Sequence, residues 1–318
     1  MKLSDGLLKM NQPNIVFIGG TGRCGTNVIK DILSLNQDVG SLPFETRFTI
    51  DPDGLIDSLT GITQASSPFI ADLKIKRLKS FLKQLSTKNS ASLIDKSYYA
   101  DWELSKHFHN YDELVDKLIK GVSHFTYTAK WPGALSNNSL MYHSTDASTI
   151  EFEFSEFINT LYSDFLYRNN KKIYVEDNTY NSLFIDKLLH LCPNAKFIHM
   201  VRDPRDVIAS YIGQRWTPTD LADVIYFYKN LINSSIKNER KLNCDSFIRI
   251  KLEDLCKEPK HVLNKLSIFC GIDYVEEFSK FDLTRSNSGR WQTQFSTTEI
   301  EFITETLQDE LTMLGYSQ

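Results

Sequence analysis

The sequence has few cysteines and no long hydrophobic run. Its 318 residues include five cysteines, an odd number that are far apart, and no two of them form a C-x-x-C pair. This pattern argues against a disulfide framework and against a thiolate metal site, so we expect no metal. No apolar stretch approaches the roughly 20 residues that a membrane-spanning helix needs. The segment "MKLSDGLLKMNQPN" lacks the apolar core of a signal peptide. We therefore expect a soluble, cytoplasmic protein with no membrane partner.

An excess of basic residues is also missing. Lys and Arg total 36 against 40 Asp and Glu, which gives a formal net charge of -4. Such a chain has no overall positive field that would attract nucleic acid, and we expect no nucleic-acid partner. An anionic ligand must instead be bound by a local group of side chains and backbone amides.

What the sequence does contain is a regular alternation of strand and helix patterns at its two ends. Residues 14–20 form a short apolar run typical of a buried parallel strand, and residues 25–35 have apolar residues at helical spacing. The segments "KKIYVED" and "AKFIHMVRD" predict two further strands separated by the helical "SLFIDKLLHLC". This alternation predicts an α/β fold with a mostly parallel sheet flanked by helices.

Later segments continue the pattern. A helix is predicted from the Asp203 cap, and a long amphipathic helix from "PTDLADVIYFYKNL" onward. The segment "SFIRIKLEDL" predicts one more strand, and a helix follows from Pro259. Residues 298–314 predict a closing helix, with Ser296 and Glu299 spaced as a capping box. Residues 51–171 do not continue the alternation and are mostly helical in pattern, which indicates an insertion.

The stretch "GGTGRCGTN" lies between the first strand and the first helix and fits three phosphate-binding signatures. Read as G-x-G-x-x-G, it is the dinucleotide fingerprint of Gly20, Gly22 and Gly25. The acid expected on the ribose would be Glu45, but "SLPFETRF" resembles a loop more than a strand end. A nucleoside triphosphate loop needs a lysine where this sequence has Thr26. The third interpretation is a phosphate-binding loop in which Arg23, and not a lysine, supplies the positive charge.

A second anion-binding pattern follows the later strand, in "FIHMVRDPRDVIASYIGQR". Arg202 ends that strand, and Ser210 lies on the helix that Asp203 caps. A guanidinium fork next to a hydroxyl is well suited to phosphate. Two phosphate sites in one chain indicate a ligand with two separated phosphates.

These segments resemble motifs of the PAPS-dependent sulfotransferases, which use 3'-phosphoadenosine 5'-phosphosulfate. "FIGGTGRCGTN" is similar to their 5'-phosphosulfate loop, G-x-x-R-S-G-T-T, and "FIHMVRDPRDVIASY" resembles their 3'-phosphate motif. "FETRF" is similar to the Glu-Thr-Arg segment of tyrosylprotein sulfotransferases. "VEDNT" stands at the place of a common E-K-T-P, "IKLEDL" resembles R-Y-E-D-L, and "SNSGRW" is similar to the family's C-terminal loop.

The resemblance implies a P-loop sulfotransferase-like fold and a set of residues that bind PAPS or its product PAP. They are Gly22, Arg23, Cys24, Gly25, Thr26 and Asn27 in the first loop, Arg202 and Ser210 in the second motif, and Ser288, Gly289, Arg290 and Trp291 near the C-terminus. An ordinary polar loop, with Trp291 in the core, is the alternative for the last four.

For catalysis, the resemblance implies Glu45 as general base and Arg23 as the cation at the departing phosphate oxygen. Arg47 would hold Glu45 or bind acceptor charge, although the two residues also fit a plain surface ion pair. Asn178 stands where the family has a lysine, and we place it on the acceptor side of the site. Cys24 and Asn27 replace two hydroxyl-bearing residues of the motif.

The expected organisation is one sulfotransferase-like domain. Its nucleotide-binding core covers residues 14–50 and 172–292, its helical acceptor-side insertion residues 51–171, and its closing helix residues 298–314. We expect sulfuryl transfer to a hydroxyl or an amine of a small-molecule acceptor, with tyrosine and carbohydrate as alternatives. An NAD-binding oxidoreductase and a non-catalytic nucleotide-binding module remain the rival classes, and a homo-oligomer is compatible with the sequence.

Overall fold

The computed structural model describes residues 12–87, 102–129, 139–240, 242–283 and 287–316. The chain divides into two compact units. We call them the sheet unit (Asn14–Ser41, Ile173–Leu189 and Asn194–Gln318) and the helical unit (Met1–Pro13, Leu42–Lys172 and His190–Pro193). Each unit is described separately.

The sheet unit is built on a five-stranded sheet with the order β2-β5-β1-β6-β7, in which every pair of neighbours is parallel. The strands are β1 (Asn14–Gly19), β2 (Val39–Gly40), β5 (Ile173–Asp177), β6 (Lys196–Val201) and β7 (Phe247–Lys251). The three central strands are buried along almost their whole length, as expected of a parallel sheet that is covered on both faces. The predicted α/β class is thus confirmed.

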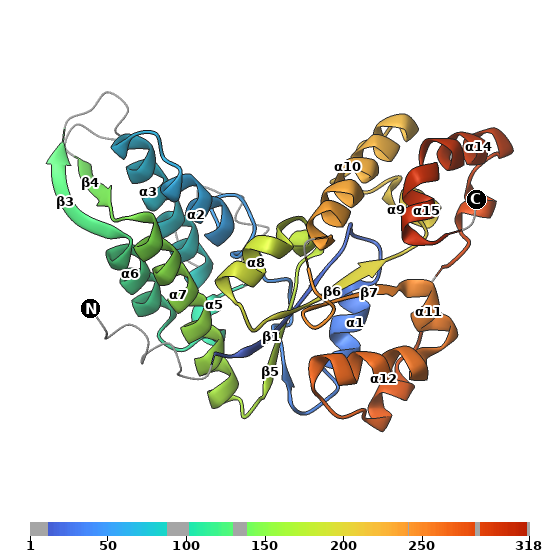
Figure 1. Ribbon diagram of the computed structural model, residues 1–318, viewed down its shortest axis with the longest axis horizontal. Coiled ribbons are helices and arrows are strands. Elements are labelled where there is room, and N and C mark those ends of the chain that lie inside the picture. The colour runs from blue at the N-terminus through green and yellow to red at the C-terminus, as the bar shows by residue number, and fades with distance from the viewer. Residues whose placement is uncertain (1–11, 88–101, 130–138, 241, 284–286, 317–318) are drawn as a thin grey trace. The chain divides into compact units, whose positions relative to one another are not determined.

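Helices cover both faces of this sheet (Figure 1). The helices after the strands are α1 (Thr26–Leu33), the 3-10 helix η1 (Thr179–Phe184), α8 (Ile185–Leu191), α9 (Pro204–Tyr211), α10 (Leu221–Glu239), α11 (Leu252–Lys257), α12 (Pro259–Cys270), the 3-10 helix η2 (Glu276–Lys280), α13 (Trp291–Gln294), α14 (Thr297–Thr306) and α15 (Gln308–Leu314). Successive side chains of a strand point to opposite faces. On β6, Ile198 and Met200 therefore join the core under α1 and α12, whereas Val201 joins the core with α9 and α10.

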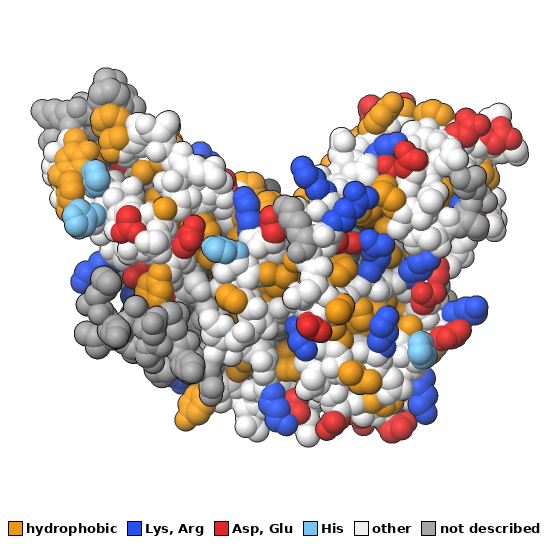
Figure 2. All heavy atoms as spheres, viewed as in Figure 1, with side chains coloured by type: hydrophobic (Ala, Val, Ile, Leu, Met, Phe, Trp, Pro, Cys, Tyr) orange, Lys and Arg blue, Asp and Glu red, His pale blue; other side chains and the backbone are white. Residues whose placement is uncertain are grey.

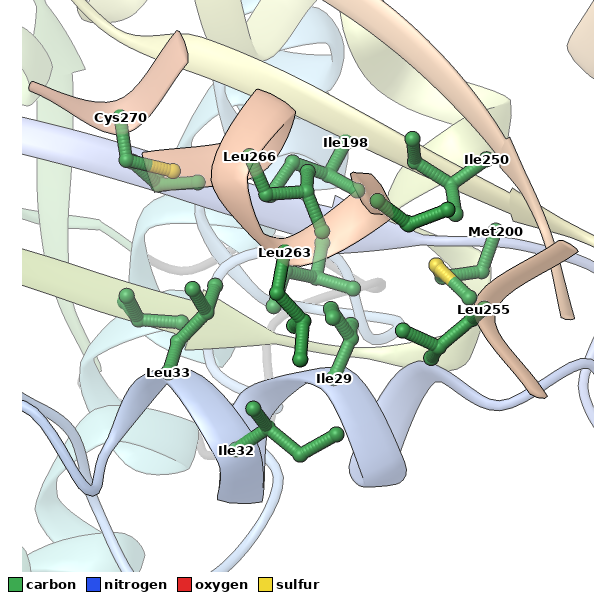
Figure 3. Close-up of a cluster of buried hydrophobic side chains, with 14 of the residues drawn as sticks. Ile29, Ile32, Leu33, Ile198, Met200, Ile250, Leu255, Leu263, Leu266 and Cys270 are labelled. Atoms are coloured by element: carbon green, nitrogen blue, oxygen red, sulfur yellow. The ribbon is translucent and has the colours of Figure 1, made fainter. Parts of the chain in front are cut away.

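Figure 3 shows the first of these two cores, in which side chains of α1, α11 and α12 meet the strands. Ile29 and Leu33 lie one turn apart on α1 and are fully buried. They pack with Leu263 and Leu266 of α12 and with Ile198 of β6. This packing fixes α1, and with it the loop that precedes α1.

Two sequence predictions differ from the structure in detail. The strand predicted in "SFIRIKLEDL" ends at Lys251, because Glu253 and Asp254 favour the first turn of a helix and α11 begins there. The closing helix is two helices, since Leu307 has a non-helical backbone and is fully buried between α14 and α15. Its predicted capping box of Ser296 and Glu299 is confirmed.

The helical unit also contains a short antiparallel hairpin that the sequence pattern did not predict. The helices are α2 (Leu55–Thr63), α3 (Pro68–Ser86), α5 (Leu104–His107), α6 (Tyr111–Gly121) and α7 (Ala147–Arg168), and the hairpin strands are β3 (Ser123–Ala129) and β4 (Ser139–Ser144). Figure 2 shows hydrophobic and His side chains together on the hairpin surface. Phe125 of β3 is 49% exposed and stacks on His143 of β4, with 4.6 Å between the ring centroids.

None of the helices in the described part of the chain is both long and apolar enough to cross a membrane.

Replacing Leu263 with Ala should destabilise the sheet unit. The side chain is fully buried in the core of Figure 3, so its removal leaves a cavity. We expect the free energy of unfolding to fall by about 3 kcal/mol. Urea unfolding followed by circular dichroism measures this value. Ile268 lies on the same helix but is 82% exposed, and Ile268→Ala should change the free energy by less than about 0.5 kcal/mol. Equal losses in both variants would contradict this description of the core.

Candidate functional site

The glycine-rich loop leaves β1 and enters α1 through a series of left-handed backbone conformations. Gly22, Arg23 and Gly25 have φ values of 86°, 57° and 94°. At Gly25 a side chain is also excluded by space, because its Cβ would lie 2.8 Å from Cδ1 of Leu252. Arg23 adopts this conformation without being glycine, which costs about 1 kcal/mol or more. A conformation with that cost is a feature often found at functional sites.

Side chains of the loop divide into a buried pair and an exposed pair. Cys24 is fully buried and Thr26 is 4% exposed, whereas Arg23 and Asn27 are exposed. Burial raises the pKa of the Cys24 thiol, so this group stays neutral at physiological pH. The thiol also fills the space next to Gly20, where an added Cβ would lie 2.3 Å from Sγ of Cys24. Cys24 therefore supports the loop from inside, and Arg23 carries its charge to the surface.

The turn that follows β5 is bonded directly to this loop. The Gly20 amide donates to the carbonyl of Thr179 at 2.9 Å, and the Ser182 hydroxyl donates to the carbonyl of Gly20 at 2.7 Å. Asn178 is fully buried, and its side-chain oxygen accepts from the Tyr180 amide at 3.1 Å. Asn178 thus begins η1 as its cap. The sequence indicated a substrate-side position, and the structure adds this supporting role.

The second predicted cluster lies at the end of β6 and in α9. Asp203 caps α9 by accepting from the Arg205 amide at 2.9 Å, and it also forms an ion pair with the Arg205 guanidinium at 2.8 Å. Arg202 is 6% exposed and Ser210 is 5% exposed. These two residues face the first loop.

The two clusters contact each other. Nε of Arg23 donates to the Ser210 hydroxyl at 2.8 Å, and Nη1 of Arg202 donates to the carbonyl of Arg23 at 3.2 Å. Segments nearly two hundred residues apart in the sequence therefore build one site within the sheet unit. That site carries the positive charge of two arginines next to a hydroxyl and a helix N-terminus, a combination that binds anions well.

The predicted C-terminal loop closes on the same site, because Nη2 of Arg202 donates to the carbonyl of Asn287 at 2.7 Å. Asp206, which is 1% exposed, accepts from the amide of Gly289 at 2.8 Å and from that of Trp291 at 3.2 Å. The guanidinium of Arg205 lies 4.1 Å from the Trp291 ring centroid. Ser288 and Arg290 belong to this loop, and both are exposed. The loop is thus tied to α9 rather than free in solvent.

Glu45 and Arg47 lie in the helical unit, in an irregular segment before α2. Nη1 of Arg47 is 3.3 Å from Oε2 of Glu45, and its Nε is 2.9 Å from a carboxylate oxygen of Asp51. All three side chains are at least three-quarters buried. Asp51 therefore orients Arg47, and Arg47 in turn holds the Glu45 carboxylate.

Sequence reasoning missed three residues of the site. Asp206 has a signal in the repeated acid of "RDPRD", but its partners are more than eighty residues away in the chain. Tyr211 is fully buried and its hydroxyl donates to the carbonyl of Thr21. Trp216 lies over Gly22, within 3.2 Å of the place where a Cβ would be. No local sequence pattern predicts the contacts of Tyr211 and Trp216.

The first strand of the parallel sheet leads through a glycine loop into a helix, with one arginine in that loop and another at the end of the adjoining strand. This arrangement defines an α/β protein with a candidate anion-binding site. The chain belongs to the sulfotransferase family, whose model matches residues 13–277. This match confirms the resemblance found in the motifs. A search of curated proteins finds no match.

Solved structures of sulfotransferases have a similar fold. A sulfotransferase domain from the curacin biosynthetic pathway is 15% identical, with a TM-score of 0.51, over 96% of this chain and 98% of that domain. A sulfotransferase domain of the Synechococcus PCC 7002 olefin synthase is 15% identical, with a TM-score of 0.49, over 94% and 96%. Sulfotransferase STF1 of Mycobacterium tuberculosis H37Rv is 13% identical, with a TM-score of 0.46, over 94% and 77%. The first of these likenesses shows the predicted fold.

Replacing Asp206 with Ala should release the C-terminal loop from α9. The variant loses two hydrogen bonds to a charged acceptor, each worth about 1.5–3 kcal/mol, so we expect amide exchange in residues 287–291 to rise at least about tenfold. Hydrogen exchange read by mass spectrometry measures this rate. The exposed Asp223 of α10 gives the control, since Asp223→Ala should leave the exchange of this loop unchanged. Unchanged exchange in Asp206→Ala would show that other contacts hold the loop.

Proposed function

We propose that this protein is a PAPS-dependent sulfotransferase that transfers a sulfuryl group to a hydroxyl group, or to an amine, of a small-molecule acceptor. The observation that carries the proposal is the direct contact of Arg23 with Ser210 and of Arg202 with the Arg23 carbonyl. A nucleotide with phosphates at both its 5' and 3' positions needs two anion sites within one molecule's reach. This pair of contacts supports such an arrangement.

The polar groups of the site fit this ligand. Nε of Arg202 is buried and has no hydrogen-bond partner among the described residues, so this guanidinium retains a donor for a phosphate oxygen. The loop ends at the N-terminus of α1, where backbone amides and the helix dipole favour negative charge. Residues 287–291 would cover the 3' end of the nucleotide.

Bound PAPS would supply an activated sulfuryl group whose transfer leaves negative charge on the departing phosphate oxygen. In the proposal, the guanidinium of Arg23 and the loop amides stabilise that charge. Thr26 adds a buried hydroxyl at the first turn of α1. Cys24 and Asn178 act by holding the loop in shape, because both are buried and neither carries a positive charge.

Glu45 is the proposed general base, and its carboxylate would take the proton that the acceptor hydroxyl loses. The chain of Asp51, Arg47 and Glu45 supports this role, because the carboxylate is held by an oriented arginine. The proposal rests here on the resemblance of "FETRF" to the Glu-Thr-Arg segment.

The rival classes have weaker support. A dinucleotide-binding protein would place its ribose-binding acid at a strand end in the sheet, whereas Glu45 lies in an irregular segment of the helical unit. A non-catalytic nucleotide-binding module is favoured by Asn178, which stands where the family has a lysine. Binding and turnover must therefore be measured separately.

Calorimetry should show that the protein binds adenosine 3',5'-bisphosphate (PAP) more tightly than ATP or NAD. In Arg202→Ala the dissociation constant for PAP should rise about a hundredfold, because about 3 kcal/mol of charge-assisted hydrogen bonding is lost. The exposed Arg240 on the same unit serves as control, and Arg240→Ala should bind PAP like the wild type. Tighter binding of NAD or ATP than of PAP would contradict the proposal.

In Glu45→Gln, the rate of sulfuryl transfer should fall about 10²- to 10⁴-fold while PAP affinity stays unchanged. The measurement is mass-spectrometric detection of sulfated products when PAPS and a library of hydroxyl and amine acceptors are supplied. Glu113 is an exposed carboxylate of the same unit, and Glu113→Gln should keep the full rate. A full rate in Glu45→Gln as well would remove Glu45 from the mechanism.

A further inference from the structure

The strand β3 lies at the edge of the hairpin, and none of its seven residues is buried. Figure 1 shows β3 on the outer side of β4, and β4 packs on α3. The part of the chain that the structure describes adds no third strand to this sheet. An edge strand presents unpaired amide and carbonyl groups, which make it a template for pairing with another strand.

The outer edge of β4 is bonded to a helix, whereas the outer edge of β3 is open. The Tyr142 amide points away from β3 and donates to a carboxylate oxygen of Asp72 in α3 at 2.8 Å. Thr126 lies opposite Tyr142 in the ladder, and Thr128 lies opposite Leu140. Backbone groups of an antiparallel pair point alternately toward and away from the partner strand, so those of Thr126 and Thr128 point outward. They have no hydrogen-bond partner among the described residues.

The sequence of β3 lacks the features that usually protect an edge strand. It reads SHFTYTA and contains no Lys, Arg, Asp, Glu or Pro, the residues that commonly prevent edge pairing. A bulge also hinders pairing, but the register shift lies between Ser123 and Phe125, and the ladder is regular from Phe125 to Ala129. Aromatic residues and threonine favour an extended strand. The edge is therefore open to another strand.

A second copy of β3 is complementary to this edge. Phe125 and Tyr127 lie on one face of the strand, with 6.0 Å between their ring centroids. An antiparallel copy with Thr126 opposite Thr126 of the partner subunit brings Phe125 opposite Tyr127 of the partner subunit, and outward backbone groups meet outward backbone groups. Aromatic rings opposite each other across two strands stabilise a sheet, and the two-fold axis creates this contact twice. A charged partner strand would find no opposite charge on β3, which favours a second copy.

We propose that β3 pairs with β3 of a second copy of this chain and joins the two hairpins into one four-stranded antiparallel sheet. The proposal concerns the hairpin alone and is independent of the proposed function. Pairing through one strand of seven residues gives an interface at the small end of the range for protein complexes. The dimer should therefore dissociate on dilution, with a dissociation constant of about 10⁻⁵ M.

Sedimentation velocity on the full chain without nucleotide measures the association, over concentrations from about 10⁻⁶ to about 10⁻⁴ M. The wild type should change from monomer to dimer across this range. Thr126→Pro removes an outward amide and leaves the ladder to β4 intact, so its dissociation constant should rise at least about tenfold. Thr126→Val keeps the backbone groups and should dimerise like the wild type.

A charge pair tests whether the strand pairs with its own copy. Thr126→Lys and Thr126→Glu each place like charges across the two-fold axis, so each variant alone should stay monomeric. An equimolar mixture of the two should form a dimer, a result that misfolded variants would not give. The control is Phe302 on α14, which is 43% exposed, and Phe302→Lys should dimerise like the wild type.

Hydrogen exchange of the wild type adds a measurement that needs no variant. Amide exchange in residues 123–129 should slow as the protein concentration rises, because the outward amides become paired in the dimer.

Three results would overturn the proposal, whether or not the protein binds PAP. They are a wild type that stays monomeric at every concentration, equal dimerisation of the wild type and Thr126→Pro, and an equimolar mixture of Thr126→Lys and Thr126→Glu that stays monomeric. The first result would leave the β3 edge to a strand of another protein, and the second would place the dimer contact on another surface.

Discussion

The hydrogen bond from Arg23 to Ser210 is the interaction on which the site depends. It joins residues 187 positions apart, one in the loop after β1 and one in the helix after β6. Because β1 and β6 are neighbours in a parallel sheet, their carboxyl ends meet at one edge. The sheet order therefore creates the site, and the arginines give it its charge.

The shape of the glycine-rich loop between β1 and α1 follows from its backbone conformation and from the burial of the Cys24 side chain. Three of the four residues from Gly22 to Gly25 are left-handed and turn the chain sharply, and the fourth, Cys24, is buried and supports the loop from inside. The turn after β5 then bonds to the loop through Gly20. Arg23 can take its costly conformation because these neighbours hold the backbone on both sides. In this rigid loop the charged Arg23 side chain is exposed, and the Trp216 ring lies next to Gly22.

The sequence predicted those parts of the fold that are determined by residues close together in the chain. The β1–loop–α1 unit, the Asp203 cap of α9 and the Ser296 capping box were all predicted, because each depends on residues that are close together in the sequence. The hairpin of β3 and β4 was not, since it depends on packing from elsewhere: Met141 is buried and the Tyr142 amide donates to Asp72 of α3 at 2.8 Å. Asp206 and Trp216 were missed for the same reason, because their partners are distant in sequence. The role of Glu45 stays a prediction, because it comes from a resemblance and because Glu45 lies in the helical unit.

We propose that one nucleotide spans the two phosphate-binding clusters. A crystal structure of the protein with PAP tests it most directly. We expect a single PAP molecule with its 5'-phosphate against the amides of residues 22–27 and its 3'-phosphate against Arg202 and Ser210. A nucleotide bound elsewhere, or one that touches only one of these two clusters, would contradict it.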